Sequence, residues 1–126
     1  MTAVLEHANV TVSDPDATAA WMCDLFGWHV RWSGASMQTG RTVHVGSDAH
    51  YLALYSPGTP GKAKDDSYGT VGGLNHLAVV VDDINDMERR VTDAGFSPMN
   101  HGSYEPGRRF YFHDTDNVEY EVVQYD

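Results

Sequence analysis

The chain has 126 residues, enough for one domain with a hydrophobic core and too few for two domains of ordinary size. Its formal charge of −10 argues against binding to nucleic acid, and no apolar run approaches the roughly 18 residues of a membrane helix. The single cysteine, Cys23, excludes an internal disulfide and favours a reducing, cytoplasmic location. We therefore expect a soluble single domain whose partner is a small molecule.

The first β-rich run of the chain, residues 5–12, occurs again at residues 74–81. Both runs have leucine first and histidine third, which places His7 and His76 at equivalent positions. Each run is followed by aspartates that can cap a helix. The sequence therefore indicates an internal repeat, although chance similarity of two strand–helix units is the alternative.

Two stretches of helical character follow these strands, at about 16–26 and 84–94. Each ends at a glycine, Gly27 or Gly95, suited to the left-handed position after a helix. An offset of 68 residues relates the two glycines and carries further β-rich segments of the first half onto the second. The strands predicted after the helices are 28–33, 41–45 and 51–55 in the first half, and 96–100, 109–113 and 119–123 in the second.

Each half is thus predicted to be a βαβββ module. Module one covers about 3–56, a turn-rich joining loop or lid covers about 57–73, and module two covers about 74–125. The predicted fold class is α+β, with the two modules forming a cupped mixed sheet and the helices outside it.

Three potential metal ligands share one predicted face of the sheet. Side chains alternate along a strand, so the apolar residues of each strand pack on the helices and His7, His76 and Glu121 face the concave side. The repeat defines a fourth equivalent position, which is occupied by Ala53. Each residue alone is more often a surface group than a ligand. Their joint placement predicts a divalent metal site, and Fe²⁺, Mn²⁺ and Zn²⁺ all accept such a set.

Other features of the sequence do not add a second site. His29, His44 and His50 lie outside the predicted metal set, and His44 is interpreted as a surface or packing residue because it alternates with two valines. The sequence has no phosphate-binding loop, dinucleotide fingerprint or nucleophile elbow, so no organic cofactor is predicted.

The paired halves, the histidine near the start of each, and an Asp-x-Asp turn before Glu121 resemble the vicinal oxygen chelate superfamily. That group includes glyoxalase I, extradiol dioxygenases, fosfomycin-resistance enzymes, methylmalonyl-CoA epimerase and bleomycin-binding proteins. Glyoxalase I-like members carry glutamate where this chain has Ala53, so the resemblance makes glyoxalase I activity unexpected. Extradiol dioxygenases and fosfomycin enzymes carry a tyrosine ten residues before the metal-binding glutamate, and Tyr111 has that spacing. The segment departs from the dioxygenase pattern at Thr115 and Asn117, where proline and glycine are usual.

The resemblance and the predicted strand register suggest catalytic roles around the metal. If Tyr111 lies opposite Glu121, its hydroxyl can hydrogen-bond a substrate oxygen. His113, or less favourably His101, would move a proton, and Arg109 could orient a substrate carboxylate. An aromatic core residue is the alternative interpretation of Tyr111. The same register is expected to turn inward, in the first module, Arg41, Tyr51 and Tyr55.

The function that these features favour is a divalent-metal-dependent enzyme for a small oxygen-rich organic substrate, with extradiol-dioxygenase-like chemistry as the first choice. A Mn²⁺- or Zn²⁺-dependent lyase, isomerase or thiol transferase of the glyoxalase family is the second. A metal-free protein that sequesters a ligand, as bleomycin-binding proteins do, is the alternative from another class. A homodimer is expected, because a small domain with open sheet edges gains from burying them.

Overall fold

The computed structural model describes residues 1–37, 39–59, 61–62 and 66–126, and it contains two compact units. Unit 1 is Met1–Gly61 and unit 2 is Lys62–Asp126. The boundary lies inside the predicted joining loop. Residues 60 and 63–65 of that loop lie outside the described residues, and its prediction as a lid remains a prediction.

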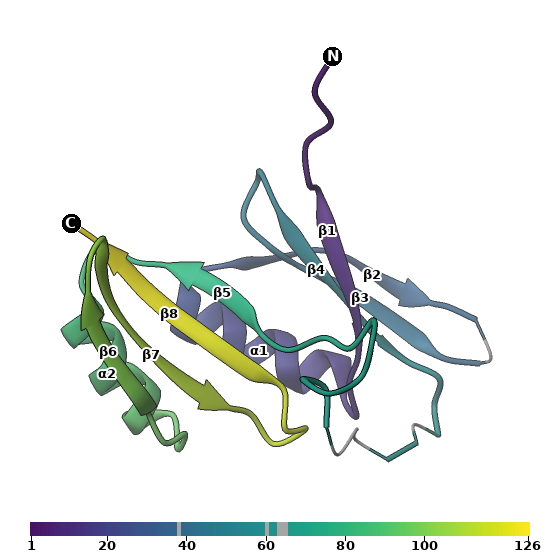
Figure 1. Ribbon diagram of the computed structural model, residues 1–126. Helices are drawn as coiled ribbons and strands as arrows, with labels where there is room; N and C mark the ends of the chain where they lie inside the picture. The colour runs from purple at the N-terminus through teal and green to yellow at the C-terminus, as the bar shows by residue number, and fades with distance from the viewer. Residues whose placement is uncertain (38, 60, 63–65) are drawn as a thin grey trace. The chain divides into compact units, whose positions relative to one another are not determined.

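Both units have the predicted order of elements (Figure 1). Unit 1 contains β1 His7–Thr11, α1 Pro15–Phe26, β2 His29–Ala35, β3 Arg41–Gly46 and β4 Tyr51–Ser56. Unit 2 contains β5 Leu77–Val80, α2 Ile84–Asp93, β6 Met99–Tyr104, β7 Gly107–His113 and β8 Glu119–Tyr125. The α+β class and the two βαβββ modules are therefore confirmed.

Each unit has a four-stranded mixed sheet with the same topology. The strand order is β1-β4-β3-β2 in unit 1 and β5-β8-β7-β6 in unit 2. The first strand of each unit is parallel to the last, and the other neighbours are antiparallel. Two copies of one topology support the predicted duplication, because unrelated strand–helix units would have no reason to share it.

The helices begin and end where the sequence predicts. Asp14 caps α1 by accepting a hydrogen bond from the Ala17 amide at 3.1 Å, and Asp83 caps α2 in the same way. Gly27 ends α1 with φ 72°, and Gly95 follows α2 with φ 95°, both in the left-handed region that glycine adopts without strain. Neither helix is long and apolar enough to cross a membrane, within the part of the chain that the structure describes.

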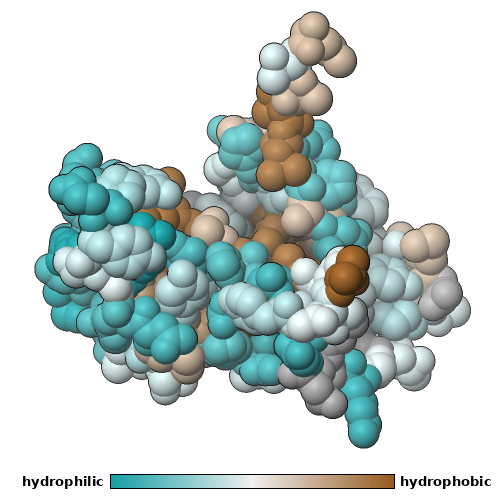
Figure 2. Space-filling model, in the orientation of Figure 1, coloured by the Kyte–Doolittle hydropathy of each residue, from teal (hydrophilic) through white to brown (hydrophobic). Residues whose placement is uncertain are grey.

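The core of each unit lies between the sheet and its helix. Alternate residues of the central strands are almost completely buried on that side, and the opposite face of each sheet carries the polar and aromatic side chains discussed below. The buried set includes Met22, Val43, Val45 and Leu54 in unit 1, and Val91, Phe110, Phe112 and Val122 in unit 2. Apolar residues before β1 lie outside the core, and Val4 and Leu5 are exposed. Figure 2 shows hydrophobic surface, in brown, along the N-terminal segment.

The predicted offset of 68 is wrong for the third strand of the repeat. His44 pairs with Ala53, whereas Tyr111 pairs with Glu121, so His44 and Tyr111 are equivalent and the offset is 67 there. The cause is the turn between the last two strands, which is one residue longer in unit 2. Arg41 is therefore not turned to the helix-free face. It forms a two-bond ion pair with Asp16 of α1, at 2.7 and 3.0 Å.

Candidate metal centre

Strand β8 supplies two carboxylates to the helix-free face of unit 2. Glu119 and Glu121 share this face because side chains two residues apart point the same way, while Tyr120 between them is buried on the other side. Glu121 is 8% exposed, so its charge lies in a mostly dry environment. A buried carboxylate requires hydrogen-bond or ionic partners.

His76 lies directly before β5 and meets Glu121. Its Nε2 is 3.2 Å from Oε1 of Glu121. Two ligands that each lie about 2.1 Å from one metal ion are about 3.0–3.4 Å apart at octahedral or tetrahedral angles. The His76–Glu121 spacing and the donor types therefore fit a divalent cation.

Arg109 on β7 contacts the other oxygen of Glu121. Its terminal nitrogen donates to Oε2 of Glu121 at 3.1 Å, and its guanidinium lies 4.7 Å from the centre of the Tyr104 ring. Both side chains of the pair are largely buried. The predicted role of Arg109 in orienting a substrate carboxylate remains a prediction; the carboxylate that it contacts in the structure is that of Glu121, the predicted metal ligand. Within the part of the chain that the structure describes, the Nε of Arg109 is buried without a hydrogen-bond partner.

Tyr111 lies opposite Glu121, as the sequence predicts. The two residues are paired across β7 and β8, and the Tyr111 ring meets the His76 ring edge-on at 5.6 Å between centres. Burial raises the pKa of the Tyr111 hydroxyl, and the Glu121 carboxylate raises it further. The hydroxyl therefore keeps its proton at neutral pH and acts as a hydrogen-bond donor.

Glu119 connects the remaining groups of this face. It lies 3.4 Å from Nε2 of His113 through one oxygen and 3.4 Å from Nδ1 of His76 through the other. The Tyr68 hydroxyl donates to Glu119 and lies 3.1 Å from Nδ1 of His76. This hydrogen bond raises the pKa of Tyr68 to about 12. His113, predicted as a proton carrier, is thus linked to the site through Glu119.

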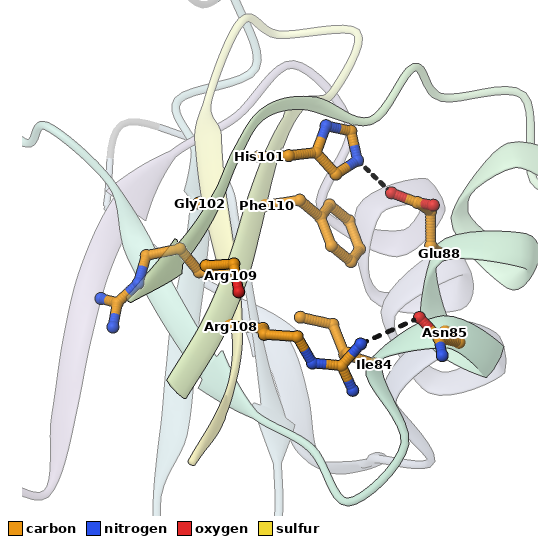
Figure 3. Close-up of a pocket in the computed structure, with 9 residues that line it drawn as sticks. Ile84, Asn85, Glu88, His101, Gly102, Arg108, Arg109 and Phe110 are labelled. Atoms are coloured by element: carbon orange, nitrogen blue, oxygen red, sulfur yellow. Dashed lines mark hydrogen bonds and ion pairs between the residues drawn. The ribbon is translucent and has the colours of Figure 1, made fainter. Parts of the chain in front are cut away.

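His101 is not brought to this group. It pairs with Glu88 of α2 and stacks on Phe110, which belongs to the helix side of the sheet. A pocket of about 230 Å³ lies there, and Figure 3 shows the Arg109 side chain pointing away from it. The pocket is lined by Ile84, Asn85, Glu88, His101, Gly102, Ser103, Arg108, Arg109 and Phe110.

His7 belongs to unit 1 and has an aromatic environment. Its ring stacks on Tyr51 at 4.8 Å, Tyr51 contacts His44 at 4.6 Å, and His44 contacts Trp32 at 5.2 Å between centres. These four rings come one from each strand of the unit 1 sheet. His44 is therefore a packing residue, as one of its two interpretations predicted. Burial lowers the His44 pKa.

The complete three-residue metal set remains a prediction. The structure brings His76 and Glu121 together within unit 2, while His7 lies in unit 1. Among the described residues, no three His, Cys, Asp or Glu side chains gather closely enough to hold a metal by themselves. The pair in unit 2 thus needs a further ligand to form a conventional site.

Three residues of these clusters were missed in the sequence. Glu119 could have been found, since it lies two positions before Glu121 and must share its face. Glu6, whose Oε1 lies 2.9 Å from Nδ1 of His7, could have been suspected as the sequence neighbour of that histidine. Tyr68 lies in the turn-rich joining loop, where no periodicity indicates the direction of a side chain.

The structure resembles solved proteins over nearly its whole length. A glyoxalase/bleomycin resistance protein/dioxygenase domain from Frankia sp. EAN1pec has 22% identity and a TM-score of 0.81, covering 100% of this chain and 93% of that one. The fosfomycin resistance protein FosX from Listeria monocytogenes, in complex with Mn(II) and sulfate, has 18% identity and a TM-score of 0.75, with coverage of 100% and 95%. FosX from Mesorhizobium loti has 22% identity and a TM-score of 0.73, with coverage of 98% and 92%. At these identities the likeness establishes the fold.

No curated protein matches the sequence significantly. A family model, however, matches residues 4–122, which is nearly the entire chain. The chain therefore belongs to the Glyoxalase/Bleomycin resistance protein/Dioxygenase superfamily.

Proposed function

We propose that this protein is a divalent-metal-dependent enzyme that acts on a small organic substrate with adjacent oxygen atoms. The metal would be held by His76 and Glu121 of unit 2 together with His7 of unit 1. The observation that carries the proposal is the 3.2 Å spacing of His76 Nε2 and Glu121 Oε1 beside the half-buried Tyr111 hydroxyl. A bound divalent metal would supply Lewis-acid catalysis.

The residues around the pair suit substrate activation. Arg109 holds one oxygen of Glu121 and keeps the carboxylate in a fixed orientation. The protonated Tyr111 hydroxyl lies on the same face and can donate to a substrate oxygen that gains negative charge during reaction. His113 can accept or return a proton, and its contact with Glu119 fixes the ring.

Two reaction classes fit this arrangement. Ring-opening oxidation of a catechol-like substrate, which would use Fe²⁺ and O₂, is the first, because two histidines and one glutamate are the ligand type of non-haem iron oxygenases. A Mn²⁺- or Zn²⁺-dependent addition, isomerisation or lyase reaction is the second. It is favoured by the fold similarity to FosX proteins, one of which is in complex with Mn(II).

Metal analysis of protein purified without chelator tests the proposal directly. The wild type is expected to bind about one metal ion per chain, and His76→Ala and Glu121→Ala are expected to lose most of it without unfolding. His29→Ala is the matched control, because His29 is an exposed histidine paired with Asp48. Stoichiometric metal in a His7→Ala/Glu121→Ala double variant would contradict the proposed ligand set.

Activity screening then separates the reaction classes. Catechols are supplied to the Fe²⁺-loaded protein with and without air, and fosfomycin is supplied to the Mn²⁺-loaded protein. Oxygen-dependent loss of a catechol supports the first class, and metal-dependent consumption of fosfomycin supports the second. A wild type that binds a cationic drug but no metal would instead support ligand sequestration, which the net charge of −10 would suit.

A further inference from the structure

The two histidines of the proposed metal set have matching surroundings at the same ring nitrogen. In unit 1, Nδ1 of His7 lies 2.9 Å from Oε1 of Glu6. The Tyr51 hydroxyl donates to that same oxygen at 3.0 Å. The imidazole thus faces a carboxylate oxygen that a tyrosine holds in place.

Unit 2 repeats this arrangement around His76. Its Nδ1 lies 3.4 Å from Oε2 of Glu119, and the Tyr68 hydroxyl donates to that same Oε2. The Tyr68 oxygen is also 3.1 Å from Nδ1 of His76. A carboxylate and a tyrosine again meet at Nδ1, while Nε2 faces Glu121.

The two tyrosines do not occupy equivalent positions of the repeat, and neither do the two glutamates. Tyr51 and Glu119 are equivalent first residues of β4 and β8, yet one supplies the hydroxyl and the other supplies the carboxylate. Their partners, Glu6 and Tyr68, come from the segment before β1 and from the joining loop. Duplication of the chain therefore does not explain why a carboxylate and a tyrosine meet at Nδ1 of both histidines. A requirement shared by the two imidazoles explains it.

That requirement is the choice of ring nitrogen. A neutral imidazole has one N–H and one lone pair, and an acceptor beside one nitrogen keeps the proton there. Metal-binding histidines commonly donate their second nitrogen to a carboxylate, which fixes the ring and its tautomer. We infer that Glu6 with Tyr51, and Glu119 with Tyr68, are positioning pairs that engage Nδ1 of His7 and His76, fix the two rings, and leave Nε2 for the metal. This inference rests on the proposed function.

Nitrogen NMR of the metal-free protein tests the tautomer without any activity assay. Two-bond ¹H–¹⁵N spectra are recorded at about pH 8.5, where ordinary histidines are neutral. His7 is expected to carry the proton on Nδ1 in the wild type. His76 is expected to do so in a Glu121→Ala background, where the carboxylate that faces its Nε2 at 3.2 Å is removed. Glu6→Ala and Glu119→Ala are expected to shift His7 and His76, respectively, towards the Nε2–H form. Glu6→Gln and Glu119→Gln keep a carbonyl acceptor and are expected to retain the wild-type tautomer.

Calorimetric titration with Mn²⁺ gives the second measurement. Glu6→Ala, Glu119→Ala and Tyr68→Phe are expected to weaken binding, by about 10- to 100-fold for the carboxylates. Asp48→Ala in unit 1 and Glu88→Ala in unit 2 are matched controls. Each removes a carboxylate that is paired with a histidine outside the proposed metal set. Both controls are expected to change the affinity less than twofold.

The two possible failures are distinguishable. Absence of any divalent metal from the wild type purified without chelator, together with no binding in the titration, would overturn the proposed function and this inference with it. Wild-type binding that survives both alanine substitutions, or an Nε2–H tautomer of His7 in the wild type, would overturn the inference alone.

Discussion

Arg109 and His76 hold opposite oxygens of the same carboxylate. Arg109 donates to Oε2 of Glu121 at 3.1 Å, and Nε2 of His76 lies 3.2 Å from Oε1. The carboxylate is therefore fixed by a permanent cation on one side and is available to a metal on the other. This division favours a single-oxygen contact between Glu121 and the proposed metal.

Replacement of Arg109 by methionine should destabilise the protein by about 3 kcal/mol, because it leaves the Glu121 charge buried without its cation. Urea unfolding of the metal-free protein measures the effect. The Arg109→Met/Glu121→Gln double variant should regain part of this loss, since it removes the unpaired charge as well. Equal stability of the single and double variants would show that the unpaired Glu121 charge is not the cause of the loss.

Tyr111→Phe should lower kcat about 10-fold or more once a substrate is found, on the scale of losing one transition-state donor. Metal content should stay unchanged, because the hydroxyl is not among the proposed ligands. Steady-state kinetics with a parallel metal assay checks both expectations. An unaltered kcat/KM would make Tyr111 a packing residue only.

Stability should fall at alkaline pH through Tyr120. This side chain is 1% exposed and donates to Asp114 Oδ2 at 2.9 Å, and burial raises its pKa above the ordinary value of about 10. The folded state therefore holds the proton more tightly than the unfolded state. The resulting stability is complete below about pH 10 and is lost as the pH rises further.

Urea unfolding of the wild type and Tyr120→Phe from about pH 8 to about pH 11 measures this dependence. The variant should be less stable at the lower end, because the hydrogen bond to Asp114 is lost. Its stability should depend less steeply on pH, so the two curves should converge. Parallel curves would assign the alkaline loss to other groups.

Asn117 should tolerate glycine but not alanine. Its φ of 62° lies in the left-handed region, within the turn where Asp114 accepts hydrogen bonds from the Asp116 and Val118 amides. Asn117→Gly should leave stability within about 0.5 kcal/mol, and Asn117→Ala should cost about 1 kcal/mol. Thermal or urea unfolding checks the pair. Equal losses in both variants would implicate the asparagine side chain instead of the backbone.

We expect a homodimer in solution. Strands β1 and β5 are edge strands of their sheets, and Val80 of β5 is 67% exposed. Open edges and exposed apolar groups favour association with a second chain. Light scattering at micromolar concentration, with and without Mn²⁺, gives the mass. A monomer under both conditions would contradict this expectation.

The sequence alone determined the modular fold. Histidines at matching positions, aspartate caps and glycines after two helices are local signals, and each depends on a few neighbouring residues. The alternation along β8 likewise determined that Glu121 faces away from the core, because its neighbours Tyr120 and Val122 are apolar. The pairing of Tyr111 with Glu121 was predicted correctly because the assumed length of the turn between β7 and β8 was correct.

The tertiary structure decided what local patterns could not. One extra residue in the β7–β8 turn shifted the repeat, so His44 became the counterpart of Tyr111 and Arg41 paired with a helix. The partners of Glu121 and of His76 come from distant segments, Arg109 among them. No periodicity specifies such contacts, since they depend on how strands and a loop meet in space and on which buried charge needs a partner.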